Sequence, residues 1–123
     1  MSRIRKTGSK PEVTVRQLAH RLGYRFRINR RDLPGTPDIV FPSRRKTIFV
    51  HGCFWHQHEG CHLANKPRTR IEYWLPKLAR NVQRDMQASE ALRKLGWEVL
   101  VIWECEVKEH ETLTGRLRDF LDP

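Results

Sequence analysis

The sequence lacks long apolar runs. No hydrophobic stretch approaches the roughly 20 residues that a helix needs to cross a bilayer. The first residues, rich in Arg and Lys, lack the apolar region of a secretory signal. Internal repeats, low-complexity tracts and linker-like segments are also absent. These absences argue against membrane-spanning, secreted and repeat proteins, and they indicate a soluble cytoplasmic protein of one domain.

Cysteine is scarce, since the 123 residues contain three. An odd number, with two of the three beside histidines, argues against a disulfide framework. It indicates instead a metal site in a reducing compartment.

Acidic residues are scarce in the first part of the chain. Residues 1–50 carry 13 Lys or Arg against 3 Asp or Glu, whereas residues 51–123 carry 11 of each, so the net charge of +10 lies in the first 50 residues. Such polarisation indicates a surface for a polyanion, although a basic face that is merely solvated explains it about as well. DNA or RNA fits better than a membrane, because no basic amphipathic helix coincides with the charge.

Hydrophobic periodicity predicts an α/β fold in the order helix, three strands, helix, strand, helix. The expected helices are 11–22, 76–95 (opened or kinked by Pro76) and 111–121, and the expected strands are 24–28, 38–41, 47–50 and 97–103, the last buried on both faces. The face of the middle helix is predicted to carry Leu75, Leu78, Val82, Met86, Ser89, Leu92 and Leu95. Residues 1–10 are predicted to form a short basic arm and residues 11–123 a single domain.

The segment 51–62 concentrates potential metal ligands, with two cysteines and four histidines in twelve residues. We expect a closed structural zinc site of the Cys3His type, with the ligands Cys53, His58, Cys61 and Cys105. Spacing alone does not distinguish His58 from His56 or His62. Core cysteines beside surface histidines are the alternative, which this density of donors disfavours. Histidines that zinc does not use remain available for other chemistry.

Asp38 opens the strand that follows a rigid Pro- and Gly-containing turn. A carboxylate in this position can hold Mg²⁺ over a phosphate, because hard cations prefer oxygen ligands. Asp38 is also one of three acids in the basic half of the chain. An aspartate that only caps the turn after Pro37 is the more common arrangement, so this motif alone does not assign a function.

Aromatic residues gather around the metal-binding segment and the start of the long helix. Such rings beside a basic surface can stack on bases or wedge between base steps. Core packing is the alternative, and it is the role expected of Tyr73. Phe54 and Trp55 have less reason to be core residues, because they lie on a loop held between Cys53 and His58.

Four segments form one combined pattern: residues 33–38 (Leu-Pro-Gly-Thr-Pro-Asp), 51–58 (His-Gly-Cys-Phe-Trp-His-Gln-His), 68–74 (Arg-Thr-Arg-Ile-Glu-Tyr-Trp) and 97–105 (Trp-Glu-Val-Leu-Val-Ile-Trp-Glu-Cys). Together they resemble the very-short-patch repair (Vsr) endonucleases, over about residues 9–105. The resemblance implies a restriction-endonuclease-like αβββαβ core with a structural zinc site. It also implies Mg²⁺-dependent nicking of double-stranded DNA at T:G mismatches, on the 5′ side of the mismatched thymine.

The resemblance assigns roles to individual residues. Asp38 matches the catalytic Mg²⁺ ligand, assisted by the backbone carbonyl of Val50. His56 matches the catalytic histidine, His51 a second one, and Glu12 the acid on the first helix that supports the site. The matching zinc ligands are Cys53, His58, Cys61 and Cys105, and the matching aromatic wedges are Phe54, Trp55 and Trp74. His62 receives no role.

Three features depart from the common pattern. Val50-His51-Gly52 stands where a restriction-type site has Glu-x-Lys, Glu59-Gly60 alters the spacing before the second cysteine, and the arm before Glu12 is short. The expected protein is a monomer of the bacterial cytoplasm, associated with the nucleoid and with mismatch-repair proteins. Two alternatives stay open: a nuclease of the same fold that cuts unmismatched DNA, and a non-catalytic zinc module that binds nucleic acid.

Overall fold

The computed structural model describes residues 10–61 and 69–123. In chain order its elements are α1 (Lys10–Arg21), β1 (Arg27–Ile28), β2 (Ile39–Phe41), η1 (Pro42–Arg44), β3 (Lys46–His51), α2 (Ile71–Lys94), β4 (Glu98–Trp103), η3 (Glu104–Glu106) and α3 (His110–Leu121). The predicted mixed α/β class and the predicted element order are confirmed. Among the described helices, none is both long and apolar enough to cross a bilayer.

The four strands form one sheet in the order β1-β2-β3-β4. The pairs β1–β2 and β2–β3 are antiparallel, whereas β3 and β4 are parallel and are connected through α2. Because parallel strands end at the same edge of a sheet, the ends of β3 and β4 are neighbours, and His51 pairs with Trp103. The loop after β3 and the turn after β4 therefore meet at this edge.

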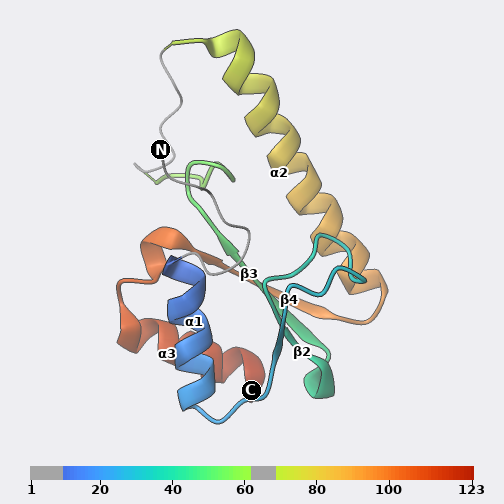
Figure 1. The fold of residues 1–123 in the computed structure, drawn as a ribbon, viewed down its shortest axis with the longest axis vertical. Helices are drawn as coiled ribbons and strands as arrows, with labels where there is room; N and C mark the ends of the chain where they lie inside the picture. Colours follow the sequence, from blue (N-terminus) through green and yellow to red (C-terminus); the bar gives the residue numbers. More distant parts are fainter. Residues whose placement is uncertain (1–9, 62–68) are drawn as a thin grey trace.

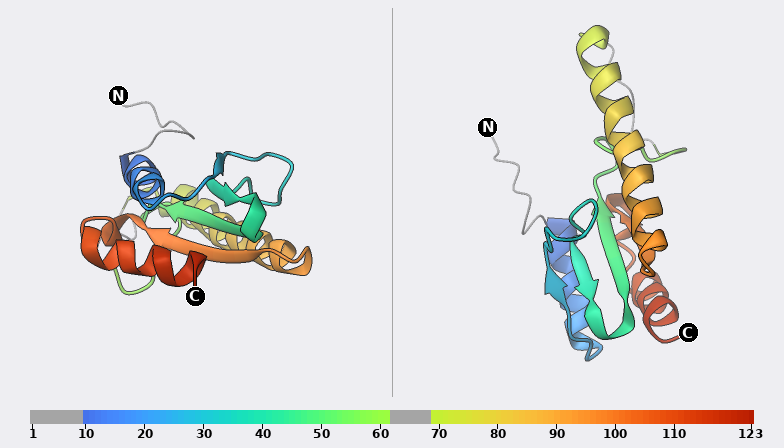
Figure 2. Two further views of the ribbon diagram at one scale, coloured as in Figure 1. Left: turned by 90° about the horizontal axis from the view of Figure 1, so that it is seen from below. Right: turned by 90° about the vertical axis from the view of Figure 1, so that its right-hand side faces the viewer.

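Helices α1 and α3 cover one face of the sheet and α2 covers the other, as Figures 1 and 2 show. The first core joins α1 and α3 to the sheet through residues such as Leu18, Ile48 and Leu117. The second core includes Val40, Phe49, Leu92 and Trp97. In Figure 1 the first turns of α2 extend well beyond the sheet, so part of this helix stands away from both cores.

Strand β4 corrects one expectation. Its residues do alternate between the two cores, with Val99 and Val101 on the α2 side and Leu100 and Ile102 on the other. Of the six residues, however, only Ile102 is buried. The predicted burial on both faces is wrong in extent, because β4 is an edge strand of the described sheet.

The first strand and the long helix have other bounds than predicted. The alternation over 24–28 is present, since Tyr24 and Phe26 make edge contacts with Phe41 while Arg25 is exposed. Only Arg27 and Ile28 pair with β2. Helix α2 begins five residues before Pro76, which lies inside it. One proline near an exposed helix start removes a single backbone hydrogen bond, so the helix tolerates it.

The turn before Asp38 packs closely against α2. Gly35 has φ +75°, and a Cβ atom there would lie 2.5 Å from the Cβ of Ala88. Leu33 is buried in the core on the α2 side. Glycine is therefore required both by the backbone conformation and by the close approach, and the contact fixes the start of β2, where Asp38 lies.

Candidate active site

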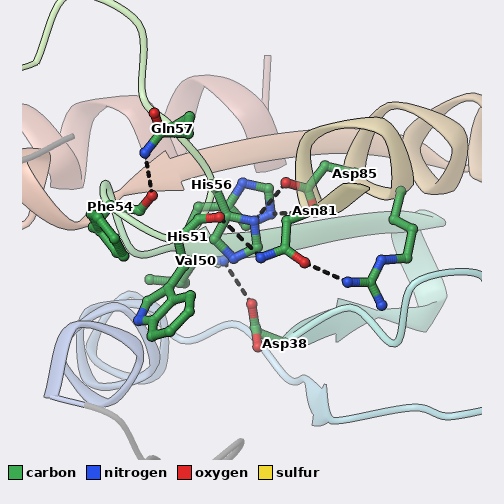
Figure 3. Close-up of polar contacts among 10 residues, drawn as sticks. Asp38, Val50, His51, Phe54, His56, Gln57, Asn81 and Asp85 are labelled. Atoms are coloured by element: carbon green, nitrogen blue, oxygen red, sulfur yellow. Dashed lines mark hydrogen bonds and ion pairs between the residues drawn. The ribbon is translucent and has the colours of Figure 1, made fainter. Parts of the chain in front are cut away.

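The loop that follows β3, residues 52–61, is held on two sides. On the α2 side, Asn81 Nδ2 donates to the carbonyl of Trp55 over 3.2 Å. On the β4 side, the amide of Cys53 donates to Glu104 Oε1 over 3.2 Å. In Figure 3 the rings of His51 and His56 lie side by side, with Asp85 of α2 next to His56.

One group of ligand atoms brings together the four predicted zinc ligands. The donor atoms of Cys53, His58, Cys61 and Cys105 all lie within 4.8 Å of one another. His58 Nδ1 is 3.7 Å from Cys53 Sγ and 3.4 Å from Cys105 Sγ. Sulfur ligands of a tetrahedral zinc ion, with Zn–S bonds of about 2.3 Å, lie about 3.8 Å apart. The group is therefore close to the size that one such ion requires.

The chemistry of this Cys/His group also fits a cation. Burial, together with the neighbouring thiols of Cys105 and Cys61, raises the pKa of Cys53 to about 12. Without a cation the buried thiol of Cys53 resists ionisation, whereas a bound metal ion stabilises thiolates. Of the two described candidates, His58 belongs to this Cys/His group and His56 does not, and His62 lies outside the described residues.

Asp38 lies at the same end of β3. Its Oδ2 accepts a hydrogen bond of 2.7 Å from the amide of Val50. Burial raises the pKa of Asp38 to about 7; the Val50 amide opposes this shift, and the neighbouring Glu12 adds to it. Glu12 is 2% exposed, and its Oε2 lies 3.6 Å from Arg16 Nε.

These two acids fit a divalent cation. A carboxylate with little access to solvent and another acid beside it is stabilised by a positive ion, and Mg²⁺ commonly uses one or two carboxylates with water as its other ligands. The structure places the backbone of Val50 against Asp38 through its amide. Among the described residues, Asp38 and Glu12 do not join a third side-chain donor in a metal-sized group.

The predicted catalytic histidine is held by an acid that sequence analysis missed. His56 Nδ1 lies 2.5 Å from Asp85 Oδ2, and His51 Nε2 lies 3.9 Å from Asp85 Oδ1 (Figure 3). Because a carboxylate only accepts hydrogen bonds, the Asp85 contact places the proton of His56 on Nδ1. Nε2 of His56 is then the nitrogen that can accept or deliver a proton.

A signal for Asp85 was present in the sequence. Leu78, Val82, Asp85, Ser89 and Leu92 follow helical spacing, so Asp85 occupies a core-facing position of the long helix. The predicted face included Met86 instead, which is wrong because Met86 is 68% exposed. Leu75 and Leu95 are also exposed. An acid at a core position is costly unless it has a partner, which is why it indicates a functional pair.

His51 has a different environment from His56. The residue is 6% exposed, and its ring stacks on that of His56 with 3.9 Å between centroids and 6° between planes. Burial, and then the neighbouring His56, lowers the pKa of His51 to about 4. His51 is therefore neutral at neutral pH. The donor atoms of His51, His56 and Asp85 also lie within 4.8 Å of one another, so a metal site is the alternative. A metal ion binds an imidazole nitrogen in the plane of the ring, and one ion cannot lie in the planes of two parallel stacked rings. The geometry therefore favours proton transfer over metal binding.

The predicted wedge residues form a contiguous aromatic cluster. The ring centroid of Phe54 is 5.3 Å from that of Trp55 and 5.7 Å from that of Trp74, and the two tryptophans are 5.7 Å apart. All three are half-buried, and neither core includes them. Tyr73 contacts Trp74 but is 49% exposed. The expected core role of Tyr73 is wrong, because this part of α2 extends beyond the cores.

Comparison with known proteins identifies the family. The family model described as "DNA mismatch endonuclease Vsr" matches residues 1–62, about half of the chain. The chain belongs to the Vsr family. The matched part contains the two acids Glu12 and Asp38, the histidines His51 and His56, and three of the four residues of the Cys/His group. The Vsr match therefore covers most of the candidate active site.

Curated relatives agree with the Vsr assignment. The chain is 52% identical over all of its 123 residues to "Type II nicking enzyme V.XorIIP" of Xanthomonas oryzae pv. oryzae, of which it covers 90%. It is 48% identical over 75% of its length to "DNA mismatch endonuclease Vsr" of Escherichia coli, of which it covers 58%. It is 38% identical over 95% of its length to "Type II nicking enzyme V.NmeAIP" of Neisseria meningitidis, of which it covers 83%. This Vsr protein is therefore a DNA endonuclease, of mismatch or nicking type.

The Asp85 contact gives a testable prediction for this Vsr protein. Replacing Asp85 with asparagine should lower the single-turnover nicking rate by about 10²- to 10⁴-fold, because His56 loses the partner that fixes its ring and tautomer. Binding to the same duplex should stay within a few-fold of wild type. Replacing Gln87, an exposed residue of α2, with alanine is the matched control. Wild-type nicking by the Asp85→Asn protein would contradict the assigned contact.

Proposed function

We propose that this protein nicks one strand of double-stranded DNA at T:G mismatches, on the 5′ side of the mismatched thymine, in a Mg²⁺-dependent reaction. The observation that carries the proposal is the pairing of His56 with Asp85 beside the half-buried Asp38 and the buried Glu12. A proton-transfer group next to a cation site is the arrangement that phosphodiester hydrolysis requires. We further propose that the sheet and its helices form a restriction-endonuclease-like core within a single domain, residues 11–123.

The roles of the catalytic residues follow from their surroundings. Asp38, with Glu12 nearby and the Val50 carbonyl, would hold Mg²⁺, which when bound neutralises charge that develops on the scissile phosphate. His56 directs Nδ1 to Asp85, so its Nε2 takes or delivers the proton. His51, buried and neutral, packs under the His56 ring and limits its rotation. Proton transfer is therefore assigned to His56 and not to His51.

The loop that carries His56 would also recognise the mismatch. We assign zinc to Cys53, His58, Cys61 and Cys105, which hold both ends of the segment containing Phe54, Trp55 and His56. Rings outside the two cores can enter a base stack, and unstacking costs least where pairing is already weak. Phe54, Trp55 and Trp74 are therefore proposed to wedge into the duplex beside the mismatch.

Paired duplexes test this function directly. With Mg²⁺ present, purified protein should nick a T:G duplex about 100-fold faster than the identical C:G duplex, because unstacking an intact step costs a few kcal/mol more. The nick should map to the 5′ side of the thymine, and chelation of Mg²⁺ should stop it. Equal rates on the two duplexes would refute mismatch specificity.

The relatives named as nicking enzymes favour a second candidate, a same-fold nuclease that cuts unmismatched DNA at a sequence. Equal cleavage of T:G and C:G duplexes is the outcome that this candidate predicts. The non-catalytic zinc module is not retained, because the chain belongs to an endonuclease family. A monomeric state, nucleoid association and mismatch-repair partners stay predictions.

A further inference from the structure

Two open hollows adjoin α1 and β1, on a part of the surface that the proposed chemistry does not use. One has a volume of about 510 Å³ and the other about 720 Å³. Both are lined by Arg16 and Phe26, so they form one continuous depression, here named the α1–β1 groove. Its other basic lining residues are His20, Arg21, Arg27 and Arg30.

The groove is strongly cationic. Of the described residues that line it, four are arginines and none is Asp or Glu. Arg30 is partly neutralised, because its Nη2 lies 2.6 Å from Asp32. Arg21 and Arg27 are exposed and form no side-chain hydrogen bond or ion pair with another described residue. Exposed guanidinium groups without protein partners, along a depression, suit phosphate oxygens.

Arg16 connects this groove to the active site. Its Nε lies 3.6 Å from Oε2 of Glu12, the acid that neighbours Asp38 in the active site. The groove therefore begins beside the two acids and continues past α1 toward β1. A strand whose scissile phosphate lies at Asp38 can continue into it.

We propose that the α1–β1 groove binds the sugar–phosphate backbone of the DNA strand that leads away from the scissile phosphate, with Arg16 nearest to the cut and Arg21 and Arg27 farther along. The position of the cut rests on the proposed function, but binding of backbone phosphates does not. Contacts of this kind orient the duplex and carry no sequence information. They should contribute equally to T:G and C:G duplexes.

A matched pair of double variants tests the groove. Arg21→Gln with Arg27→Gln removes two groove charges, and Arg93→Gln with Arg118→Gln removes two exposed charges from α2 and α3. Without Mg²⁺, the groove variant should bind both duplexes about tenfold more weakly than wild type. Its slope of log affinity against log salt should be lower by about two units, one for each lost phosphate contact. The control should match wild type in both respects.

Neutral methylphosphonates placed singly along the nicked strand locate the contacts. With wild type, substitution of particular phosphates on one side of the cut should weaken binding, and with the groove variant the same substitutions should have no further effect. An unchanged salt slope, or substitutions that act equally on both proteins, would overturn the groove assignment. If wild-type protein nicks T:G and C:G duplexes at equal rates, the proposed function is overturned. The binding measurements still test the groove in that case, because they do not depend on mismatch selectivity.

Discussion

Replacing Asp38 with asparagine is expected to abolish nicking and, at the same time, to stabilise the metal-free protein at pH 8. Nicking is lost because the amide does not supply the negative charge that a divalent cation requires. Stability rises because the buried carboxylate is costly when ionised, whereas the amide oxygen can still accept the hydrogen bond from Val50. The same substitution is therefore expected to lower nicking activity and to raise the stability of the metal-free protein.

The pH dependence has a definite sign. The pKa of Asp38 is about 7 in the folded protein against an ordinary value of 3.8. Between these values the folded state binds more protons than the unfolded state, so the stability of the metal-free protein falls as pH rises from about 4 to about 7. One pKa unit corresponds to about 1.4 kcal/mol, which sets an upper limit of about 4 kcal/mol on the loss. The asparagine variant should lack this fall.

Thermal unfolding at pH 5 and pH 8, with chelator present, measures the effect. We expect the Asp38→Asn protein to have the higher melting temperature at pH 8 and a much smaller advantage at pH 5. Asp119→Asn, at an exposed position of α3, is the matched control and should follow wild type. Equal melting temperatures at pH 8, or measurable nicking by the Asp38 variant, would show that the carboxylate does not have the assigned role.

The second large effect is expected at the Cys/His group. Cys105→Ser should remove the proposed zinc ion and lower nicking by at least about 100-fold, since a structural zinc ion contributes about 10–16 kcal/mol of apparent binding free energy to the parts that it joins. Cys105 connects the turn after β4 to the loop that carries His56. Without this connection the loop is held mainly by Asn81, Asp85 and Glu104.

Metal content by mass spectrometry and the sulfur-to-metal absorption of a cobalt-substituted sample are the measurements. Cys105→His supplies another zinc ligand, so it should keep more metal and more activity than Cys105→Ser. His110→Ser, at the exposed start of α3, is the control for removal of a ligand-type side chain. A Cys105→Ser protein with one tightly bound zinc ion and wild-type nicking would refute the ligand set.

The parts of the fold that depend on local pattern could be predicted, and those that depend on distant packing could not. Periodicity predicted the element order, and the density of donors in 51–62 predicted the group of possible metal ligands. Asp85 was missed because its partner His56 is distant in sequence and meets it only through the β3–α2–β4 connection. Met86 was wrongly assigned to the buried face of the long helix. It lies next to that face in sequence, and nothing in the neighbouring residues indicates that its apolar side chain is exposed. Tyr73 was assigned to a core, but it lies in the first turn of α2, before the part of the helix that packs against the sheet.

Helix α2 contacts three consecutive residues of the loop after β3, namely Phe54, Trp55 and His56. Trp74 touches Phe54 and Trp55, Asn81 holds the backbone of Trp55, and Asp85 holds His56. Trp74 and Asp85 are eleven residues apart on this helix, about 16 Å along its axis. A tilt of α2 moves both residues together, so the proposed insertion of the aromatic rings into DNA would be coupled through this helix to the position of the carboxylate that orients His56.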